Sequence, residues 1–179
     1  MIDKDETGNS QANTLCKSCG LCCSGHLFSW VRLKATELDS SQALGLNVIR
    51  SDPRQRGFTQ PCPLWNGQCT IYTSPDYPRV CHNYKCKLLK ELLDENVPLP
   101  NALMVVQQAN TMILELEALL PTSTNVSFRE RLVARLEDAN APAGSEFRLK
   151  AEALLAYFKT HFGVADFTDE SFSIFANAL

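Results

Sequence analysis

The chain has 179 residues, a formal net charge of −3 and 45 % apolar residues. This length fits one ordinary domain, or a small domain with an appendage, and the composition is that of a globular protein rather than a disordered one. No apolar run approaches the roughly 18 residues that a membrane span needs, and the first 14 residues are polar and acidic, unlike a secretory signal. We therefore expect a cytoplasmic protein with no membrane contact.

The first half of the chain predicts short elements joined by loops. Residues 1–15 are polar and predict a mobile tail. Aromatic and branched side chains over residues 27–33 predict a short strand, and residues 47–50 predict another. Between them, residues 36–45 predict a short helix that begins at a threonine N-cap and ends at a glycine. Prolines and glycines over residues 52–78 predict loops and exclude long helices.

The second half predicts helices, because its apolar side chains recur at the spacing of one helix face. The sequence Ser127-Phe128-Arg129-Glu130 is a capping box, which is typical of a helix start. Gly163 follows an apolar stripe and is typical of a helix end. The expected helices cover residues 88–93 and 101–120, a segment opened by Ser127, a segment from Ser145 to Gly163, and residues 169–178.

Eight cysteines lie between residues 16 and 86, and the second half of the chain has none. Their pattern begins as C-x-x-C-x-x-C-C, a spacing at which a tight turn can aim two sulfurs at one ion. In a reducing compartment, dense cysteines indicate metal more often than disulfides. A disulfide framework is compatible with the even count but fits the adjacent pair poorly. The predicted metal ligands are Cys16, Cys19, Cys22, Cys23, Cys62, Cys69, Cys81 and Cys86.

Eight thiolates divide naturally into two groups of four. Side chains of the neighbours Cys22 and Cys23 diverge in most backbone geometries, so one centre could take Cys16, Cys19 and only one of that pair. The spacing leaves the division open. It also leaves the metal open between zinc and an iron–sulfur cluster. Closed tetrahedral zinc would stabilise a loop-rich segment, whereas the Cys62-Pro63 pair resembles the remote cluster ligand of bacterial ferredoxins.

Charge is distributed unevenly along the chain, with a net of +6 over residues 16–90 and −7 over residues 91–179. Cations close to cysteines favour the thiolate form. Metal centres held by four thiolates carry a net negative charge, which would in turn neutralise these cations. The alternative is that this segment attracts an anionic substrate or a nucleic acid. Nucleic acid is the less favoured partner, because no recognised binding motif accompanies the charges. The basic residues in question are Arg54, Arg56, Arg79, Lys85 and Lys87.

The complete cysteine pattern resembles that of a known family. The residues concerned are Cys16-Lys17-Ser18-Cys19-Gly20-Leu21-Cys22-Cys23, Cys62-Pro63-Leu64, Gly67-Gln68-Cys69-Thr70-Ile71-Tyr72, Pro78-Arg79-Val80-Cys81 and Tyr84-Lys85-Cys86. Over residues 16–86 they resemble the YkgJ-like C-x-x-C-x-x-C-C family of zinc- or iron-chelating proteins. That family is mainly bacterial and includes the flagellin lysine methylases. The resemblance implies metal binding by all eight cysteines and no particular reaction.

Two positions depart from the family pattern. Tyr77 and His82 stand where the family has arginines, and the loss of both would remove an anion contact that a family enzyme needs. His82 is instead a candidate for an additional ligand or for a hydrogen-bond donor to a thiolate. His26 and His161 have weaker claims to either role.

These observations predict an α+β fold with a small, loop-rich, metal-stapled cysteine module followed by a mainly helical half. The expected organisation is a polar tail over residues 1–15, the cysteine module over 16–87, and a helical region over 88–179 packed on or beside it. We expect a metal-binding protein whose centre is structural or serves as a redox relay, with an unidentified protein or small molecule as partner. The alternatives are an iron–sulfur-dependent oxidoreductase or methyltransferase, and a zinc-stapled basic module that binds nucleic acid.

Overall fold

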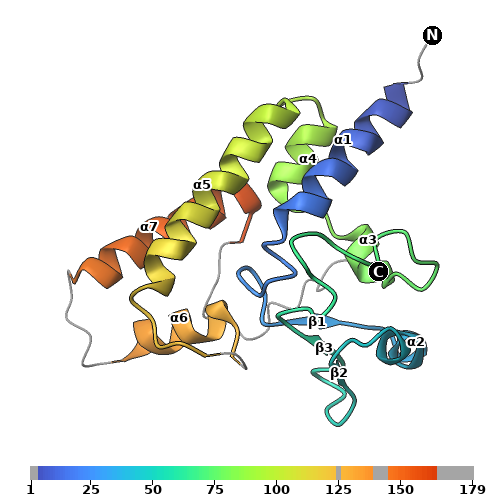
Figure 1. Ribbon diagram of the computed structural model, residues 1–179, viewed down its shortest axis with the longest axis horizontal. Coiled ribbons are helices and arrows are strands. Elements are labelled where there is room, and N and C mark those ends of the chain that lie inside the picture. The colour runs from blue at the N-terminus through green and yellow to red at the C-terminus, as the bar shows by residue number, and fades with distance from the viewer. Residues whose placement is uncertain (1–3, 124–125, 139–144, 165–179) are drawn as a thin grey trace.

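The computed structural model describes residues 4–123, 126–138 and 145–164, with side chains from residue 10 onwards. The fold is α+β, as expected, and combines helices with a small antiparallel sheet (Figure 1). The helices are α1 (Lys4–Cys19), α2 (Leu38–Ala43), α3 (Arg79–Asn83), α4 (Lys87–Leu93), α5 (Leu99–Glu117), α6 (Phe128–Glu137) and α7 (Glu146–Phe162), and a 3-10 turn, η1 (Ala35–Glu37), precedes α2. The strands are β1 (Trp30–Arg32), β2 (Val48–Ile49) and β3 (Gly57–Thr59).

The sheet has the order β1-β3-β2, so its central strand comes last in the chain. Val31 of β1 and Val48 of β2 both pair with Phe58 of β3. The strands expected over 27–33 and 47–50 are therefore present in shorter form. The prediction of loops over residues 52–78 is wrong at β3, where Phe58 is buried and its strand is paired on both sides. A strand of three residues is too short to show the alternating pattern from which strands are predicted. The core beneath the sheet consists of Val31, Leu33, Leu38, Leu46, Phe58 and Val80.

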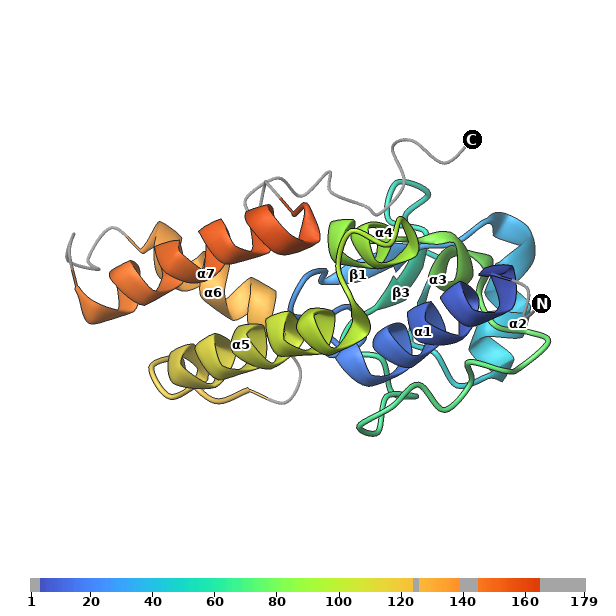
Figure 2. The ribbon, with the colours of Figure 1, turned by 90° about the horizontal axis from the view of Figure 1, so that it is seen from above.

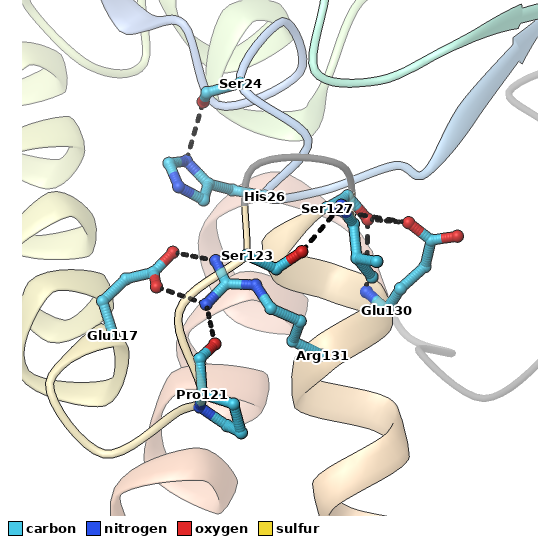
Figure 3. Close-up of polar contacts among 9 residues, drawn as sticks. Ser24, His26, Glu117, Pro121, Ser123, Ser127, Glu130 and Arg131 are labelled. Atoms are coloured by element: carbon cyan, nitrogen blue, oxygen red, sulfur yellow. Dashed lines mark hydrogen bonds and ion pairs between the residues drawn. The ribbon is translucent and has the colours of Figure 1, made fainter.

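Helices α5, α6 and α7 lie toward the left side of Figure 2, away from the sheet, whereas α4 lies in the middle and packs against α1. The four predicted helices that lie within the described residues are confirmed as α4, α5, α6 and α7, and the helix expected over residues 169–178 lies outside them. Ser127 caps α6 through the predicted capping box, in which Glu130 accepts a hydrogen bond from the Ser127 backbone N–H at 2.9 Å (Figure 3). Gly163 ends α7 in the left-handed conformation, with φ of +74°.

The N-terminal segment differs from its prediction. We expected residues 1–15 to be a mobile polar tail, and the structure instead places Lys4–Cys19 in helix α1. Only two apolar side chains, those of Ala12 and Leu15, mark the buried face of this helix before its cysteines begin. That stripe is too short to stand out in a polar sequence, and the helix gains its stability from packing against α4 and α5.

One core joins the first cysteine block to the C-terminal helices. Buried Leu21 and Leu27, which belong to the chain that follows α1, pack in the same cluster as residues of α4, α5, α6 and α7. Cys19, Cys22 and Cys86 are partly buried against that cluster. The core beneath the sheet is separate and instead contacts Cys62 and Cys81. Five of the eight cysteines are therefore packed against one or the other of two apolar cores.

The turn after the first four cysteines is fixed to the start of α6. The buried guanidinium of Arg129 donates a hydrogen bond to the carbonyl of Leu27 at 2.7 Å, and its backbone N–H donates to the carbonyl of Gly25 at 3.3 Å. The ring of His26 lies edge-on to that of Phe128, with 5.2 Å between centroids. These contacts tie the cysteine turn to the helical half of the protein.

Candidate metal centre

Helix α1 and the turn after it position the first four cysteines. Cys16 and Cys19 occupy its last turn, and Gly20, with φ of +69°, ends it. A methyl group at Gly20 would collide with the indole ring of Trp65, so only glycine permits this close approach. The turn then reverses the chain through a hydrogen bond from the Ser24 N–H to the Gly20 carbonyl at 2.8 Å.

Backbone hydrogen bonds bring the later cysteines to this turn. The N–H of Cys62 donates to the carbonyl of Cys23 at 2.7 Å, and Cys69 forms an isolated β-bridge with Trp65. Cys81 lies within α3, and Cys86 is the N-cap residue of α4. All eight cysteines are half-buried free thiols. Segments far apart in the sequence thus converge on one region of the fold.

Four of the thiols form a first thiol group, defined as Cys16, Cys19, Cys22 and Cys86. They line a cavity of about 50 Å³ whose remaining wall is mostly apolar and includes Leu15 and Leu88; Cys23 borders it as well. This volume is sufficient for a water molecule or a metal ion. Burial raises the pKa of Cys22, and the thiols of Cys86 and Cys19, followed by those of Cys23 and Cys16, raise it further.

The other four form a second thiol group, defined as Cys23, Cys62, Cys69 and Cys81. Burial raises the pKa of Cys23, and of the other thiols those of Cys81, Cys62 and Cys69 contribute most. The pKa of Cys81 is likewise raised by burial first and then by Cys62 and Cys69. Cys16 interacts with members of both groups, which places it nearest to the boundary between them. The adjacent pair Cys22 and Cys23 is therefore divided between the groups.

Several of the thiols are poor nucleophiles as they stand, because burial keeps them protonated. Burial raises the pKa of Cys16 to about 11 and that of Cys19 to about 12. Buried thiolates are stable only beside a compensating cation, and a coordinated metal ion supplies one. The donor set therefore suits a thiophilic metal such as zinc or iron.

The side chains are gathered but do not form a ready coordination site. Within the described ranges, no group of three or more histidine, cysteine, aspartate or glutamate side chains has the arrangement that would hold a metal ion. The ligand set predicted from the sequence is thus brought together in two groups by the backbone, and coordination would require the thiols of each group to turn toward a common point.

None of the histidines lines the small cavity of the first thiol group. Exposed His82 lines an open cavity of about 330 Å³ together with Tyr72, Tyr77 and Arg79. His26 faces α6, and its Nδ1 lies 2.8 Å from the hydroxyl oxygen of Ser24 (Figure 3). The sequence indicates Tyr77, Arg79 and His82 singly but does not predict this cavity, because the cavity depends on how the loop before α3 folds.

Two of the basic residues noted in the sequence have local partners. Arg54 pairs with Asp52 at 3.4 Å, and the Lys87 ammonium donates to the carbonyl of Thr160 at 2.8 Å. These side chains stabilise a loop and the contact between α4 and α7, respectively. Neither side chain is therefore part of the surroundings of the thiol groups.

Among the described helices, none is long and apolar enough to cross a membrane. Comparison of the chain with protein-family models, with curated proteins and with solved structures finds no match.

Proposed function

We propose that the protein binds metal through two thiolate centres, one formed by the first thiol group and one by the second. The observation that supports this proposal is that Cys19, Cys22 and Cys86 of the first group pack against one apolar core, whereas Cys62 and Cys81 of the second group pack against another. Four thiolates are the ligand set of a closed zinc site and of a four-iron cluster. The metal is zinc or iron–sulfur, and membership of the YkgJ-like family is part of the same proposal.

The surroundings of the cysteines support thiolate centres electrostatically. A tetrathiolate zinc site carries a formal charge of −2, and residues 16–90 carry a net charge of +6. Two such sites would bring that segment close to neutrality. Burial also raises the pKa values of Cys16 and Cys19, and a bound metal ion would supply the positive charge that their thiolates need.

A structural or relay role follows from where the thiols lie. The first thiol group connects the end of α1 with the start of α4, and the second connects the turn at Cys23 with the loop at Cys62 and with α3. When bound, a metal would cross-link these segments and supply redox capacity if it were an iron–sulfur cluster. We place the protein in the cytoplasm, because eight free thiols suit a reducing compartment.

Anaerobic purification followed by metal and acid-labile sulfide analysis and a visible absorption spectrum tests the proposal. Two zinc ions per chain without colour would establish closed structural sites and exclude the redox role. Iron with stoichiometric sulfide would establish clusters and exclude structural zinc. Protein that folds and stays free of metal after reconstitution with either would refute the proposal.

A further inference from the structure

The open cavity beside α3 is a second candidate binding site. It has a volume of about 330 Å³ and is formed by the loop over residues 72–77 and by α3. Its walls carry the guanidinium of Arg79, the imidazole of His82 and the phenols of Tyr72 and Tyr77, and none of its lining residues is acidic. It is therefore polar and cationic, unlike the small apolar cavity of the first thiol group.

Arg79 differs from most other arginines of the protein. Arg50 bonds to Asp39 at 2.7 Å, and Arg131 bonds to Glu117 at 2.6 Å. The guanidinium of Arg79, in contrast, makes no hydrogen bond or ion pair with any residue in the described part of the chain. The nearby carboxylate of Glu37 instead accepts the backbone N–H of Arg79 at 3.1 Å. Arg79, which lines the cavity, thus offers a planar fork of donors that has no acceptor among the described residues.

Tyr77 supplies a neutral hydroxyl donor on the same cavity. Its ring lies against that of Tyr72, with 5.4 Å between centroids, which fixes its orientation. The Tyr72 hydroxyl already donates to the side-chain oxygen of Asn13 at 2.6 Å, whereas that of Tyr77 has no hydrogen-bond partner among the described residues. Burial raises the pKa of Tyr77, so its hydroxyl keeps its proton.

The cavity borders the second thiol group. Arg79 and His82 flank Cys81 on α3, and the thiols that act most strongly on Tyr77 are those of Cys81 and Cys69. A ligand held by Arg79 and Tyr77 would therefore lie next to this group.

We propose that this cavity binds the oxyanion group of a small molecule, a phosphate or a carboxylate, held by the Arg79 guanidinium and the Tyr77 hydroxyl beside the second thiol group. Guanidinium binds both groups through paired, charge-assisted hydrogen bonds. The site is formed by side chains that are not thiols, so it goes beyond metal binding and does not depend on it.

Calorimetric titration of the purified full chain with inorganic phosphate and, separately, with succinate tests this proposal. We expect binding of at least one anion by the wild type, about tenfold weaker binding by Arg79→Gln, and weaker binding by Tyr77→Phe. Arg56→Gln is the matched control, because Arg56 lies in the same basic segment, makes no side-chain hydrogen bond to a described residue and does not line the cavity. This control should bind like the wild type.

Three outcomes would overturn the proposal: no binding of either anion by the wild type, unchanged binding by Arg79→Gln, or equal losses in Arg79→Gln and Arg56→Gln, which would indicate general attraction to positive charge. Which anion binds more tightly distinguishes a phosphate ligand from a carboxylate ligand. Metal content, measured on the same samples, reports separately on the thiol centres.

Discussion

The backbone N–H of Cys62 donates a hydrogen bond to the carbonyl of Cys23 at 2.7 Å, which joins the two cysteine blocks directly. This bond places Cys23 with the later cysteines, although it follows Cys22 in the chain. Cys22 lines the small cavity shared with Cys86, which Cys23 also borders. One peptide unit therefore separates the two thiol groups, and the division of the adjacent pair is a property of the backbone.

The division of the cysteines into two thiol groups predicts that the metal of either group can be lost while that of the other is kept. Cys86→Ser should lose the metal of the first thiol group and keep that of the second, because Cys86 interacts with Cys22 and Cys19. Cys81→Ser should do the reverse. Metal analysis of both variants, with circular dichroism to verify folding, measures the effect. Loss of both equivalents in each variant, with the fold retained, would contradict two independent centres.

Metal binding should release protons and weaken as the pH falls. The pKa of Cys16 is about 11 and that of Cys19 about 12 because of burial, so both thiols are protonated at neutral pH and must lose protons to coordinate. Zinc titration in weak buffer with a pH indicator measures the release. Serine variants that lack one group should release correspondingly fewer protons. Zinc binding that is independent of pH between 6 and 8 would contradict protonated thiols.

Sequence patterns predicted the helices whose apolar residues recur over several turns. The long apolar stripe of α5 and the Ser127 capping box were sufficient to locate helices. Strand β3 and helix α3 are too short to carry a period, and their positions depend on the burial of Phe58 and Val80. The cysteines were recognisable as a set, but their grouping depends on a contact between Cys23 and Cys62 that no local spacing encodes.

Gly20→Ala should destabilise the turn that carries the first cysteines. The residue has a positive φ, and its new methyl group would collide with the Trp65 ring, so we expect a loss of about 2–4 kcal/mol in the free energy of unfolding. Gly67→Ala is the matched control, since Gly67 has the same φ of +69° but no atom within 4 Å of an added methyl group. It should cost only about 1 kcal/mol. Equal losses in urea denaturation would show that the Trp65 contact is unimportant.

Arg129→Met should loosen the attachment of the cysteine turn to α6. The variant keeps the length of the side chain but leaves the buried carbonyl of Leu27 without its 2.7 Å hydrogen bond, which should cost about 2–3 kcal/mol. Arg135→Met, which removes a half-exposed pair with Asp138, should cost less than about 1 kcal/mol. Hydrogen exchange of the amides near Leu27 measures the local effect, and unchanged protection there would argue against an anchoring role for Arg129.

Stability should depend on pH through His26. The Ser24 hydroxyl donates to the carbonyl of Gly20 at 2.7 Å, so its oxygen is left to accept the Nδ1–H of neutral His26 at 2.8 Å. Burial, assisted by the charge of Arg131, lowers the pKa of His26 from 6.5 to about 4, although Glu117 opposes the shift. Between these values the unfolded chain binds more protons than the folded one. The stabilisation is therefore complete above pH 6.5 and is lost progressively as the pH falls toward 4.

Urea denaturation of the wild type and of His26→Gln, at intervals between pH 7.5 and 4.5, isolates this contribution. Both proteins keep all eight thiols, so acid-induced loss of metal affects them alike and cancels in the comparison. We expect the stability advantage of the wild type to shrink by about 1–3 kcal/mol over this range, less than the full shift implies because the ring is partly exposed. If the unfolding free energies of the two proteins fall in parallel with pH, His26 is already protonated in the folded state or does not contribute to the pH dependence.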